Sequence, residues 1–592
     1  MKQESIIYSY AQALIFWGKA SLLRFRRGFL NLSDKKIRRF PFAGNLADKA
    51  VIAGSKTPLW AESAAEEQFL SAGKVHNLRL AVKKLNGLEI PANEVFSFWK
   101  HLGRTNKSKG YAAGRELREG CLIPSVGGGL CQLSNALYDA ALKADYEIVE
   151  RHAHSQIVAG SLAEQGRDAT VFWNYIDLRF KSPTAFRIEA KLDKDYLTVK
   201  FKSQNKDSKL SQLAPNETGE IQNSKSKLRI TNSCTACGAG DCFRSLKPET
   251  NLNFGRTAFL VDEFSTEIDQ YLQKTRIAKD VLFVPLDGKR FRKANYAWNL
   301  RGYAETKQSL LITFERSYKS RRLAAQGASR QLNLLAMYRK LAESYAKSLK
   351  YDATHLVVQQ NLLPFLWQSG VLGGRSFDVL MTSLPLEKLQ KTLDFAAALH
   401  KESTTLGDFR ADEKLIEAET EALQNAGRII TPHTAIAALF PHRATILDWK
   451  LPPAKEIIKR RTEKFTVVFP ASTVGRKGCF ELREAMNGLD VKLIGLGAEL
   501  EGTDFWRGFD FQKGGDDWLE TADLVVLPAF VEHKPRRLLQ AAANKIPVIA
   551  SKNCGLETLE TVETVEAGDA ENLRSAIREV LSKKDISAAA DN

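Results

Sequence analysis

Apolar and polar positions change their spacing along the chain, and each spacing predicts a type of element. Residues 168–180 and 186–201 carry partly alternating, β-branched and aromatic patterns, which predict strands. Apolar positions three and four apart predict amphipathic helices at 130–142, 331–348 and 386–400. The region 47–202 therefore mixes short helices with strands, and we expect an α+β domain there.

From about residue 250 onward, short apolar runs alternate with amphipathic helices. A first series of strand-like runs covers 258–261, 281–285, 310–313, 355–358, 377–381 and 428–431. A second series covers 466–469, 491–496, 524–527 and 547–550. Repeated β–α alternation predicts parallel sheets with helices on both faces. The expected fold class is α/β: an N-terminal α+β domain followed by two Rossmann-like parallel-sheet halves.

Changes in composition suggest where the domains begin and end. Residues 203–226 are polar and nearly free of aromatic side chains, which is typical of a linker. We expect the second fold to divide near Leu451-Pro452-Pro453. The predicted parts are a basic amphipathic leader at 1–46, a domain at 47–202, the linker at 203–226, a cysteine-rich node at 227–250, two halves at 251–450 and 451–580, and a tail at 581–592.

The composition is that of a globular protein, and the charge is strongly positive. Apolar residues make up 44% of the 592 residues and charged residues 26%. A net charge of +17 favours acidic partners, which are nucleic acid, an anionic membrane or phosphorylated substrates. The excess is uneven, because residues 1–60 hold eleven Lys and Arg against three acids.

The leader resembles neither a secretory signal nor a membrane span. Its apolar run at 11–17 is short, follows no basic segment and precedes no clear cleavage site. Two alternatives stay open: an interfacial helix on an anionic leaflet, or a helix that packs on its own domain. Seven cysteines, three of them clustered, fit a reducing compartment. We therefore expect a cytoplasmic protein, and the interfacial alternative would place it on the inner membrane surface.

One cysteine follows three glycines and precedes an apolar helix. The segment Pro124-Ser-Val-Gly-Gly-Gly-Leu-Cys-Gln-Leu-Ser-Asn135 places Cys131 at the predicted helix N-terminus, where the helix dipole favours a thiolate. His152 and His154 follow in Glu150-Arg-His-Ala-His-Ser155. Cys131 is thus either a nucleophile with a histidine base or a buried structural cysteine beside a turn.

These two segments resemble the VanW family. So do Lys74-Val-His-Asn77, Phe96-Ser-Phe-Trp99, Gly110-Tyr111 and Asp168-Ala-Thr-Val171, and the resemblance spans about residues 47–202. The resemblance implies a link to the bacterial cell envelope. Some secreted members of the family are linked to L,D-transpeptidase activity through the cysteine of this motif. The resemblance therefore also implies such chemistry here, with Cys131 as nucleophile and His152 or His154 as base.

A basic, glycine-containing loop follows the predicted strand at 466–469. It ends in Gly475-Arg-Lys-Gly478, and such a loop can place backbone N–H groups and cations around a phosphate. The downstream segment 522–551, with Glu532 and Gln540, resembles the C-terminal half of retaining family-4 GT-B glycosyltransferases. The resemblance covers about 250–580 and implies a nucleotide-sugar donor held by Arg476, Lys477, Gly478, Glu532 and Gln540, with no protein-bound metal required.

Three departures from that family pattern stand out. The second of the family's two glutamates, eight positions after Glu532, is here Gln540. The Gly-Arg that usually precedes Lys-Gly is Ala471-Ser472, and no glycine-rich acceptor loop follows the first strand at Val261-Asp-Glu-Phe. The domain is thus either a glycosyltransferase with altered donor contacts or an inactive relative that binds.

Three cysteines form a C-x2-C-x4-C pattern at Cys234, Cys237 and Cys242. Thiolates at this spacing can hold a soft cation, and zinc is the expected metal, although structural zinc usually has four ligands and no fourth lies nearby. An iron–sulfur cluster and unliganded thiols are the alternatives.

Three hypotheses for function follow. The first is sugar transfer from a nucleotide sugar to an envelope glycan or a lipid-linked peptidoglycan precursor, with no nucleic-acid partner. The second is acyl transfer at Cys131. The third is a non-enzymatic module that binds an envelope precursor and an anionic membrane surface.

Overall fold

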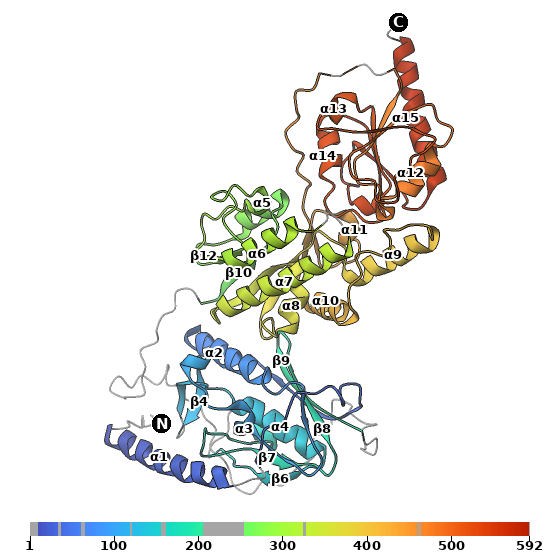
Figure 1. The fold of residues 1–592 in the computed structure, drawn as a ribbon. Coiled ribbons are helices and arrows are strands. Elements are labelled where there is room, and N and C mark those ends of the chain that lie inside the picture. The colour runs from blue at the N-terminus through green and yellow to red at the C-terminus, as the bar shows by residue number, and fades with distance from the viewer. Residues whose placement is uncertain are drawn as a thin grey trace. The chain divides into compact units, whose positions relative to one another are not determined.

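The structure is a computed structural model that describes residues 10–33, 37–60, 65–118, 121–154, 162–204, 254–323, 327–458, 460 and 463–590. The chain forms two compact units. The first comprises Met1–Arg256 with Leu349–His355 and Ser369–Ser376, and the second comprises the remainder (Figure 1). Almost all of the predicted linker, the whole cysteine-rich node and therefore Cys234, Cys237 and Cys242 lie outside the described residues.

The first unit combines small antiparallel sheets with helices, as expected for an α+β domain. Its helices are α1 (Tyr10–Ser33), α2 (Ala65–Val82), α3 (Phe98–Leu102) and α4 (Cys131–Lys143). Its strands are β1 (Val51–Pro58), β2 (Leu88–Ile90), β3 (Val95–Ser97), β4 (Ala113–Arg118), β5 (Cys121–Val126), β6 (Glu147–Glu150), β7 (Arg179–Lys181), β8 (Phe186–Leu192) and β9 (Tyr196–Ser203). They form sheets in the orders β1-β9-β8-β2, β3-β7-β6 and β4-β5.

The two strand predictions for this unit had different outcomes. The alternation at 186–201 forms the antiparallel hairpin β8–β9, whose alternate side chains are buried, so this prediction is confirmed. The prediction of a strand over 168–180 is wrong except at its end, where β7 begins. The segment instead bonds locally and to α4: the N–H of Phe172 donates to the carbonyl of Ile176, and that of Ala169 to the side chain of Asn135.

The second unit begins with a seven-stranded sheet in the order β12-β11-β10-β13-β14-β15-β16. Its strands are β10 (Arg256–Leu260), β11 (Val281–Val284), β12 (Glu305–Gln308), β13 (Ala353–Gln359), β14 (Ser376–Leu380), β15 (Ile429–Thr431) and β16 (Ala444–Ile446). Its helices are α5 (Thr266–Thr275), α6 (Leu310–Arg321), α7 (Ala328–Ser348), α8 (Leu363–Gln368), α9 (Leu386–Leu399), α10 (Glu413–Asn425) and α11 (Thr434–Ala437). The helix predictions at 130–142, 331–348 and 386–400 are confirmed by α4, α7 and α9.

A six-stranded parallel sheet in the order β19-β18-β17-β20-β21-β22 follows. Its strands are β17 (Thr466–Phe469), β18 (Lys492–Gly495), β19 (Asp510–Lys513), β20 (Leu524–Leu527), β21 (Val548–Ser551) and β22 (Val562–Val565). Its helices are α12 (Cys479–Met486), α13 (Trp518–Thr521), α14 (Arg536–Ala543) and α15 (Ala570–Ala590). Two Rossmann-like parallel-sheet halves therefore follow the α+β domain, which confirms the predicted fold class.

One predicted strand of the first series, 310–313, is wrong because it is the first turn of α6. A short apolar run does not distinguish a strand from a helix by periodicity alone. Here the N–H and the hydroxyl of Thr313 both donate to the carbonyl of Ser309, which closes a helical turn. The adjacent strand of the sheet is instead the polar β12, which carries no apolar pattern to reveal it.

Both large sheets reverse their strand order at one point, between β10 and β13 in the first and between β17 and β20 in the second. Loops that leave the carboxyl ends of two such strands diverge and leave a crevice in which α/β proteins bind ligands. The loops after β10 and β13, and those after β17 and β20, are therefore the positions at which the second unit is built to hold ligands.

Candidate functional site

A tight glycine turn places Cys131 at the start of α4 in the first unit. A Cβ atom on Gly128 would lie 2.5 Å from the backbone of Gly114, so only glycine allows the turn to pack against β4. The side chain of Asn77 on α2 fixes the turn, since its amide donates to the carbonyls of Ala112 and Gly128, each at 3.0 Å. The thiol therefore occupies a fixed place at the positive end of a 13-residue helix.

Cys131 belongs to a chain of polar side chains that ends on a buried carboxylate. Its Sγ lies 3.9 Å from Oγ1 of Thr170, and that oxygen lies 2.9 Å from Nε2 of His154. Nδ1 of His154 lies 2.5 Å from a carboxylate oxygen of Asp168, which is fully buried. Helix α4 holds this segment in place, because Ser134 donates to the carbonyl of Ala169.

The electrostatics of His154 favour the imidazolium. Burial alone would lower the pKa of His154, but its hydrogen bond to Asp168 and the nearby Cys131 thiol outweigh burial and raise the pKa to about 10. His154 is therefore protonated at neutral pH and can donate a proton. This order of cysteine, histidine and carboxylate is the one that cysteine-dependent acyl transfer would require.

The other predicted histidine lies elsewhere. The side chain of His152 is 52% exposed and faces Glu150, with 3.7 Å between Nε2 and a carboxylate oxygen. The structure therefore brings one of the two predicted histidines, His154, to the cysteine.

Sequence reasoning gave no role to Asp168, Thr170 or Lys74, although all three lie in segments that resemble the VanW family. Lys74 packs against the glycine turn, where a Cβ on Gly129 would lie 2.0 Å from its Cγ. Burial, assisted by Arg115, lowers the pKa of Lys74 to about 8. The signal that could have identified these residues was the recurrence of polar side chains in otherwise apolar, family-like segments.

In the second unit, a close backbone approach brings together the loops that follow β17 and β20. Gly478 has φ of +74°, and a Cβ there would lie 2.1 Å from the carbonyl oxygen of Pro528. The N–H of Val531 also donates to the carbonyl of Arg476 at 3.1 Å. These contacts bring the predicted residues Lys477 and Glu532 into one place, at the strand-order reversal of the second sheet.

Lys477 and Glu532 form a mostly buried ion pair. The ammonium donates to a carboxylate oxygen of Glu532 at 2.8 Å and to the carbonyl of Val531 at 2.9 Å. Burial alone would raise the pKa of Glu532, but the Lys477 ammonium outweighs it and lowers the pKa to about 2. Burial lowers the pKa of Lys477, although Glu532 opposes that effect. The Glu532 carboxylate is therefore ionised at neutral pH.

The remaining predicted donor residues lie around this pair. The guanidinium of Arg476 lies 4.5 Å from the centre of the Phe409 ring, and Gln540 lies on α14 with its side chain partly exposed. Two histidines border the pair: Nε2 of His433 lies 3.0 Å from the carbonyl oxygen of Glu532, and burial lowers the pKa of His533 to about 3. Nε2 of His533 is buried without a hydrogen-bond partner among the residues that the structure describes.

A polar network that sequence reasoning missed occupies the strand-order reversal of the first sheet. Asp262, fully buried, accepts two hydrogen bonds from Nη1 of Arg316, at 2.8 and 2.9 Å. Asn361 donates to the same carboxylate at 2.6 Å. Glu263 accepts from Nη2 of Arg316 at 2.9 Å and also pairs with Lys534, which directly links this network to the loop that carries Glu532. The acidic pair stands where the family's glycine-rich acceptor loop was expected.

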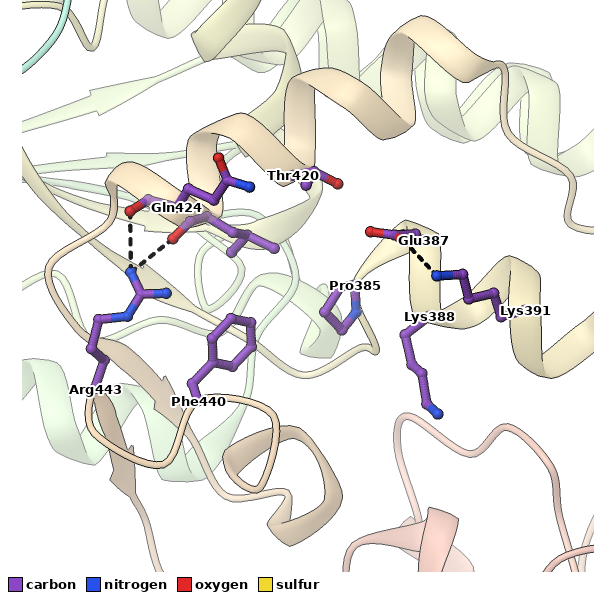
Figure 2. Close-up of a pocket in the computed structure, with 9 residues that line it drawn as sticks. Pro385, Glu387, Lys388, Lys391, Thr420, Gln424, Phe440 and Arg443 are labelled. Atoms are coloured by element: carbon purple, nitrogen blue, oxygen red, sulfur yellow. Dashed lines mark hydrogen bonds and ion pairs between the residues drawn. The ribbon is translucent and has the colours of Figure 1, made fainter. Parts of the chain in front are cut away.

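A separate pocket of about 290 Å³ lies beside α9 and α10 (Figure 2). Two of its three cations are already used within the fold. Lys391 pairs with Glu387, and Nη1 of Arg443 donates to the carbonyls of Leu423 and Gln424 near the end of α10. These cations stabilise the fold, and we assign the pocket no function.

The described part of the chain contains neither a metal-ligand cluster nor a membrane-spanning helix. No group of three or more His, Cys, Asp or Glu side chains there could hold a metal ion, and the predicted zinc ligands lie outside that part. Among the described helices, none combines the length and the apolar character that a membrane span requires.

Two family models match different parts of the chain. The model for "VanW like protein" matches residues 73–202, and the model for "Glycosyl transferases group 1" matches residues 453–592. The chain therefore joins a VanW-like region to a group 1 glycosyltransferase region, as the two resemblances predicted. The first match contains Cys131, His154 and Asp168, and the second contains Lys477 and Glu532.

Two curated relatives match the VanW-like region. The uncharacterised protein YoaR of Bacillus subtilis strain 168 is 37% identical over 107 residues, which is 18% of this chain and 35% of YoaR. The vancomycin B-type resistance protein VanW of Enterococcus faecalis strain ATCC 700802 / V583 is 36% identical over 124 residues, 20% of this chain and 44% of that protein. The chain thus spans less than half the length of either relative.

Solved structures of glycosyltransferases resemble the second part of the chain remotely. The lipopolysaccharide outer core galactosyltransferase WaaB, in its apo form, is 12% identical and covers 56% of this chain and 91% of its own, with a TM-score of 0.34. Sucrose-phosphate synthase of Thermosynechococcus elongatus is 16% identical, over 55% and 90%, with a TM-score of 0.33. Anabaena HepE in complex with UDP is 13% identical, over 56% and 90%, with a TM-score of 0.32.

Proposed function

We propose that the second unit transfers a sugar from a nucleotide-sugar donor, with retention of configuration, to an acceptor in cell-envelope glycan or peptidoglycan-precursor metabolism. The observation that carries the proposal is the Lys477–Glu532 ion pair at the strand-order reversal of the second sheet. The match of this region to group 1 glycosyltransferases supports the same reaction class. The VanW-like region in the same chain supports an envelope substrate.

The pair explains how a donor would bind. A diphosphate that approaches Lys477 competes with Glu532 for the ammonium, since both are anions. Once displaced, the Glu532 carboxylate is free to accept hydrogen bonds from sugar hydroxyls, and the Gln540 amide can bond a ribose hydroxyl. Lys477 then stabilises the charge that develops on the leaving diphosphate as the glycosidic bond to the donor breaks.

Isothermal titration of the full chain with UDP, UDP-sugars and GDP-sugars tests this proposal. We expect one of these ligands to bind and Lys477→Ala to weaken its binding at least tenfold, because a charge-assisted contact to the diphosphate is lost. Lys513→Ala is the matched control, since Lys513 is an exposed lysine on β19. Failure of every nucleotide sugar to bind, or equal binding by the two variants, contradicts sugar transfer.

A second candidate, acyl transfer at Cys131, is favoured by the contacts that link Cys131, Thr170, His154 and Asp168. The Cys131 thiolate would attack a peptide carbonyl and form a thioester, while the leaving amine takes a proton from the His154 imidazolium. An acceptor amine would then attack the thioester, transfer a proton to His154 and restore the thiolate. After the two steps, Cys131 and His154 have returned to their starting protonation states, and the leaving amine has been exchanged for the acceptor amine.

An electrophilic mimic of a peptidoglycan stem peptide tests the second candidate. Mass spectrometry should detect one adduct on Cys131, and His154→Gln should slow its formation strongly. His152→Gln is the internal control, because that imidazole faces Glu150. Absence of the adduct, or equal slowing by both histidine variants, argues for a structural cysteine.

A further inference from the structure

A basic cavity of about 470 Å³ lies beside the polar network of the first sheet in the second unit. Five cations and one carboxylate contribute to its lining: Arg292, Lys293, Arg316, Arg321, Arg330 and Glu263. They come from the loop after β11, the carboxyl half of α6, the start of α7 and the loop after β10. The cavity therefore lies at the carboxyl edge of a parallel sheet, where α/β folds bind ligands.

The cations differ in how far the protein compensates their charge. Arg316 is neutralised by Asp262 and Glu263, and Arg330 donates to the carbonyl of Ser320 at 3.1 Å. Arg292, Lys293 and Arg321 are exposed, and no carboxylate in the described part of the chain forms an ion pair with them. The adjacent residues 324–326, which are not described, are Ala-Ala-Gln and bring no charge. Among the described residues, these three cations therefore border the cavity without an ion-pair partner.

The loop that carries two of these cations is held in place by its own backbone. Arg292 has φ of +52°, in the left-handed region that non-glycine residues adopt at an energetic cost. The N–H of Lys293 donates to the carbonyl of Gly288 at 2.7 Å, and a Cβ on Gly288 would lie 2.2 Å from the backbone of Tyr296. The closed loop presents Arg292 and Lys293 at a defined position, which lowers the entropic cost of binding an anion.

One carboxylate connects the cavity to the donor residues. Glu263 lines the cavity, contacts Arg316 and pairs with Lys534. The N–H of Lys534 in turn donates to a carboxylate oxygen of Glu532 at 2.9 Å. A molecule in the cavity would therefore be connected, through Glu263 and Lys534, to the loop that carries the group that we propose contacts the donor sugar.

We propose that this cavity binds the acceptor through a phosphate group, so that the substrate class is a phosphate-bearing hydroxyl compound. This inference rests on the proposed sugar transfer. Arg292, Lys293 and Arg321 would neutralise the phosphate, and guanidinium groups suit it because their parallel N–H donors match its oxygens. The acceptor hydroxyl would lie towards Glu263 and Glu532.

Binding of simple probes separates this proposal from the donor site. The full chain is titrated with glucose 1-phosphate and with methyl glucoside, which carries no charge. We expect the phosphorylated sugar alone to bind, and the double variant Arg292→Gln/Arg321→Gln to weaken its binding at least tenfold. Arg322→Gln is the matched control, because Arg322 is the next residue along the chain and does not line the cavity.

Three outcomes overturn the proposal: no binding of glucose 1-phosphate, equal binding of the uncharged sugar, or an equal loss in Arg322→Gln. Nucleotide-sugar binding, measured on the same variants, should persist in Arg292→Gln/Arg321→Gln and fall in Lys477→Ala. If no nucleotide sugar binds, the proposed sugar transfer fails, while the phosphate measurement still reports on the cavity.

An independent observation concerns α1, whose polar side faces its own domain. Arg27 forms an ion pair with Glu150, and the guanidinium of Arg24 lies 4.8 Å from the centre of the Phe172 ring. The carbonyl of Arg24 accepts a hydrogen bond from Asn174 at 2.9 Å. The helix is thus attached through Arg24 and Arg27.

The opposite side of α1 is apolar and open to solvent. The exposed fractions are 75% for Leu14, 57% for Ile15, 69% for Leu22, 68% for Phe25, 61% for Phe29 and 54% for Leu30. These positions recur three, four and seven residues apart, so they share one face of the helix. Burial of such a face away from water is strongly favourable.

We infer that this face docks on an anionic lipid surface. The helix carries four cations and no carboxylate, and Lys19 and Arg26 are exposed beside the apolar side chains. The charge complements acidic headgroups, whereas two copies of the helix would repel one another. The apolar side chains would enter the lipid, and the cations would lie among the headgroups.

Sedimentation with vesicles tests the surface. The full chain should bind vesicles of mixed phosphatidylglycerol and phosphatidylcholine, and bind pure phosphatidylcholine vesicles about tenfold less. Phe25→Glu/Phe29→Glu should reduce binding to the anionic vesicles at least tenfold. Leu311→Glu/Ile458→Glu is the control, because these side chains are 87% and 85% exposed on other elements. Equal loss in the control, or self-association without vesicle binding, overturns the inference.

Discussion

The cysteine site of the first unit and the ion pair of the second unit differ in what they need from a ligand. Around Cys131, the side chains of Thr170, His154 and Asp168 already form a chain of contacts that ends on a buried carboxylate. At Lys477 the expected phosphate-binding ammonium is occupied by the protein's own Glu532. On the two proposed functions, the first site would be arranged for chemistry before substrate arrives, whereas the second would become competent only when a diphosphate displaces a carboxylate.

The largest expected effect comes from removing the His154 imidazole beside Cys131. His154→Gln should slow alkylation of Cys131 by iodoacetamide about thirtyfold at neutral pH, because an ordinary thiol without a neighbouring cation is only a few per cent thiolate. The rate is measured by mass spectrometry of the labelled peptide. His152→Gln should react like the unaltered protein, and a similar rate in all three proteins would contradict a prepared thiolate.

The second effect comes from breaking the ion pair between Lys477 and Glu532. Glu532→Gln leaves the Lys477 ammonium mostly buried without its counter-charge, so the free energy of unfolding should fall by about 3 kcal/mol. Urea unfolding of the second unit measures the loss. In a double-mutant cycle, Lys477→Met/Glu532→Gln should regain part of it, and strictly additive losses would show that the two residues are not coupled.

Glycine substitutions sharpen the comparison, because one close backbone approach supports each site. Gly128→Ala and Gly478→Ala each place a Cβ within 2.5 Å of backbone atoms and should cost about 2 kcal/mol. Gly128→Ala should also lower Cys131 reactivity, whereas Gly478→Ala should weaken nucleotide binding. Gly44→Ala and Gly407→Ala are the controls, since a Cβ at either position meets nothing within 4 Å. Equal melting temperatures across the four variants would contradict this role.

The pH dependence of stability gives the smallest change from one measurement to the next. Each group changes the free energy of unfolding by at most about 1.4 kcal/mol per pH unit. The raised pKa of His154 gives stability that is complete below its usual value of 6.5 and is lost as pH rises through about 10. The lowered pKa of Glu532 gives stability that is present above 4.5 and is lost as pH falls towards 2. The stability difference from His154→Gln should therefore shrink in alkali, and that from Glu532→Gln in acid. The opposite trend in either variant would contradict the charge states assigned here.

Several features could be predicted because they depend on neighbours in the chain. Alternation at 186–201 and helical spacing at 130–142 follow from the geometry of strands and helices, so β8, β9 and α4 were predictable. The run at 310–313 was not, because four apolar residues fit a strand or a helix equally well. The polar strand β12 was not predicted either, because its side chains are not buried and it carries no apolar pattern.

Which side chains meet depended on contacts distant in sequence. Nothing in Glu150-Arg-His-Ala-His-Ser distinguishes the two histidines. Only the return of the chain at Asp168 to Thr170, held against α4 by Asn135, brings His154 to Cys131. The acids Asp262 and Glu263 likewise gained a role only when α6 brought Arg316 to them.

The sequence by itself determined the order of elements, two Rossmann-like halves after an α+β domain, and the residues Cys131, Lys477 and Glu532 as those to examine. Backbone geometry repeats over a few residues, and short-range patterns therefore record it. The tertiary structure alone decided that His154 faces the thiol, that Glu532 pairs with Lys477, and that α1 turns Arg24 and Arg27 inward and its apolar side chains outward. Each of these depends on which groups distant in sequence form hydrogen bonds or ion pairs with a buried polar group. Those contacts exist only in the folded chain.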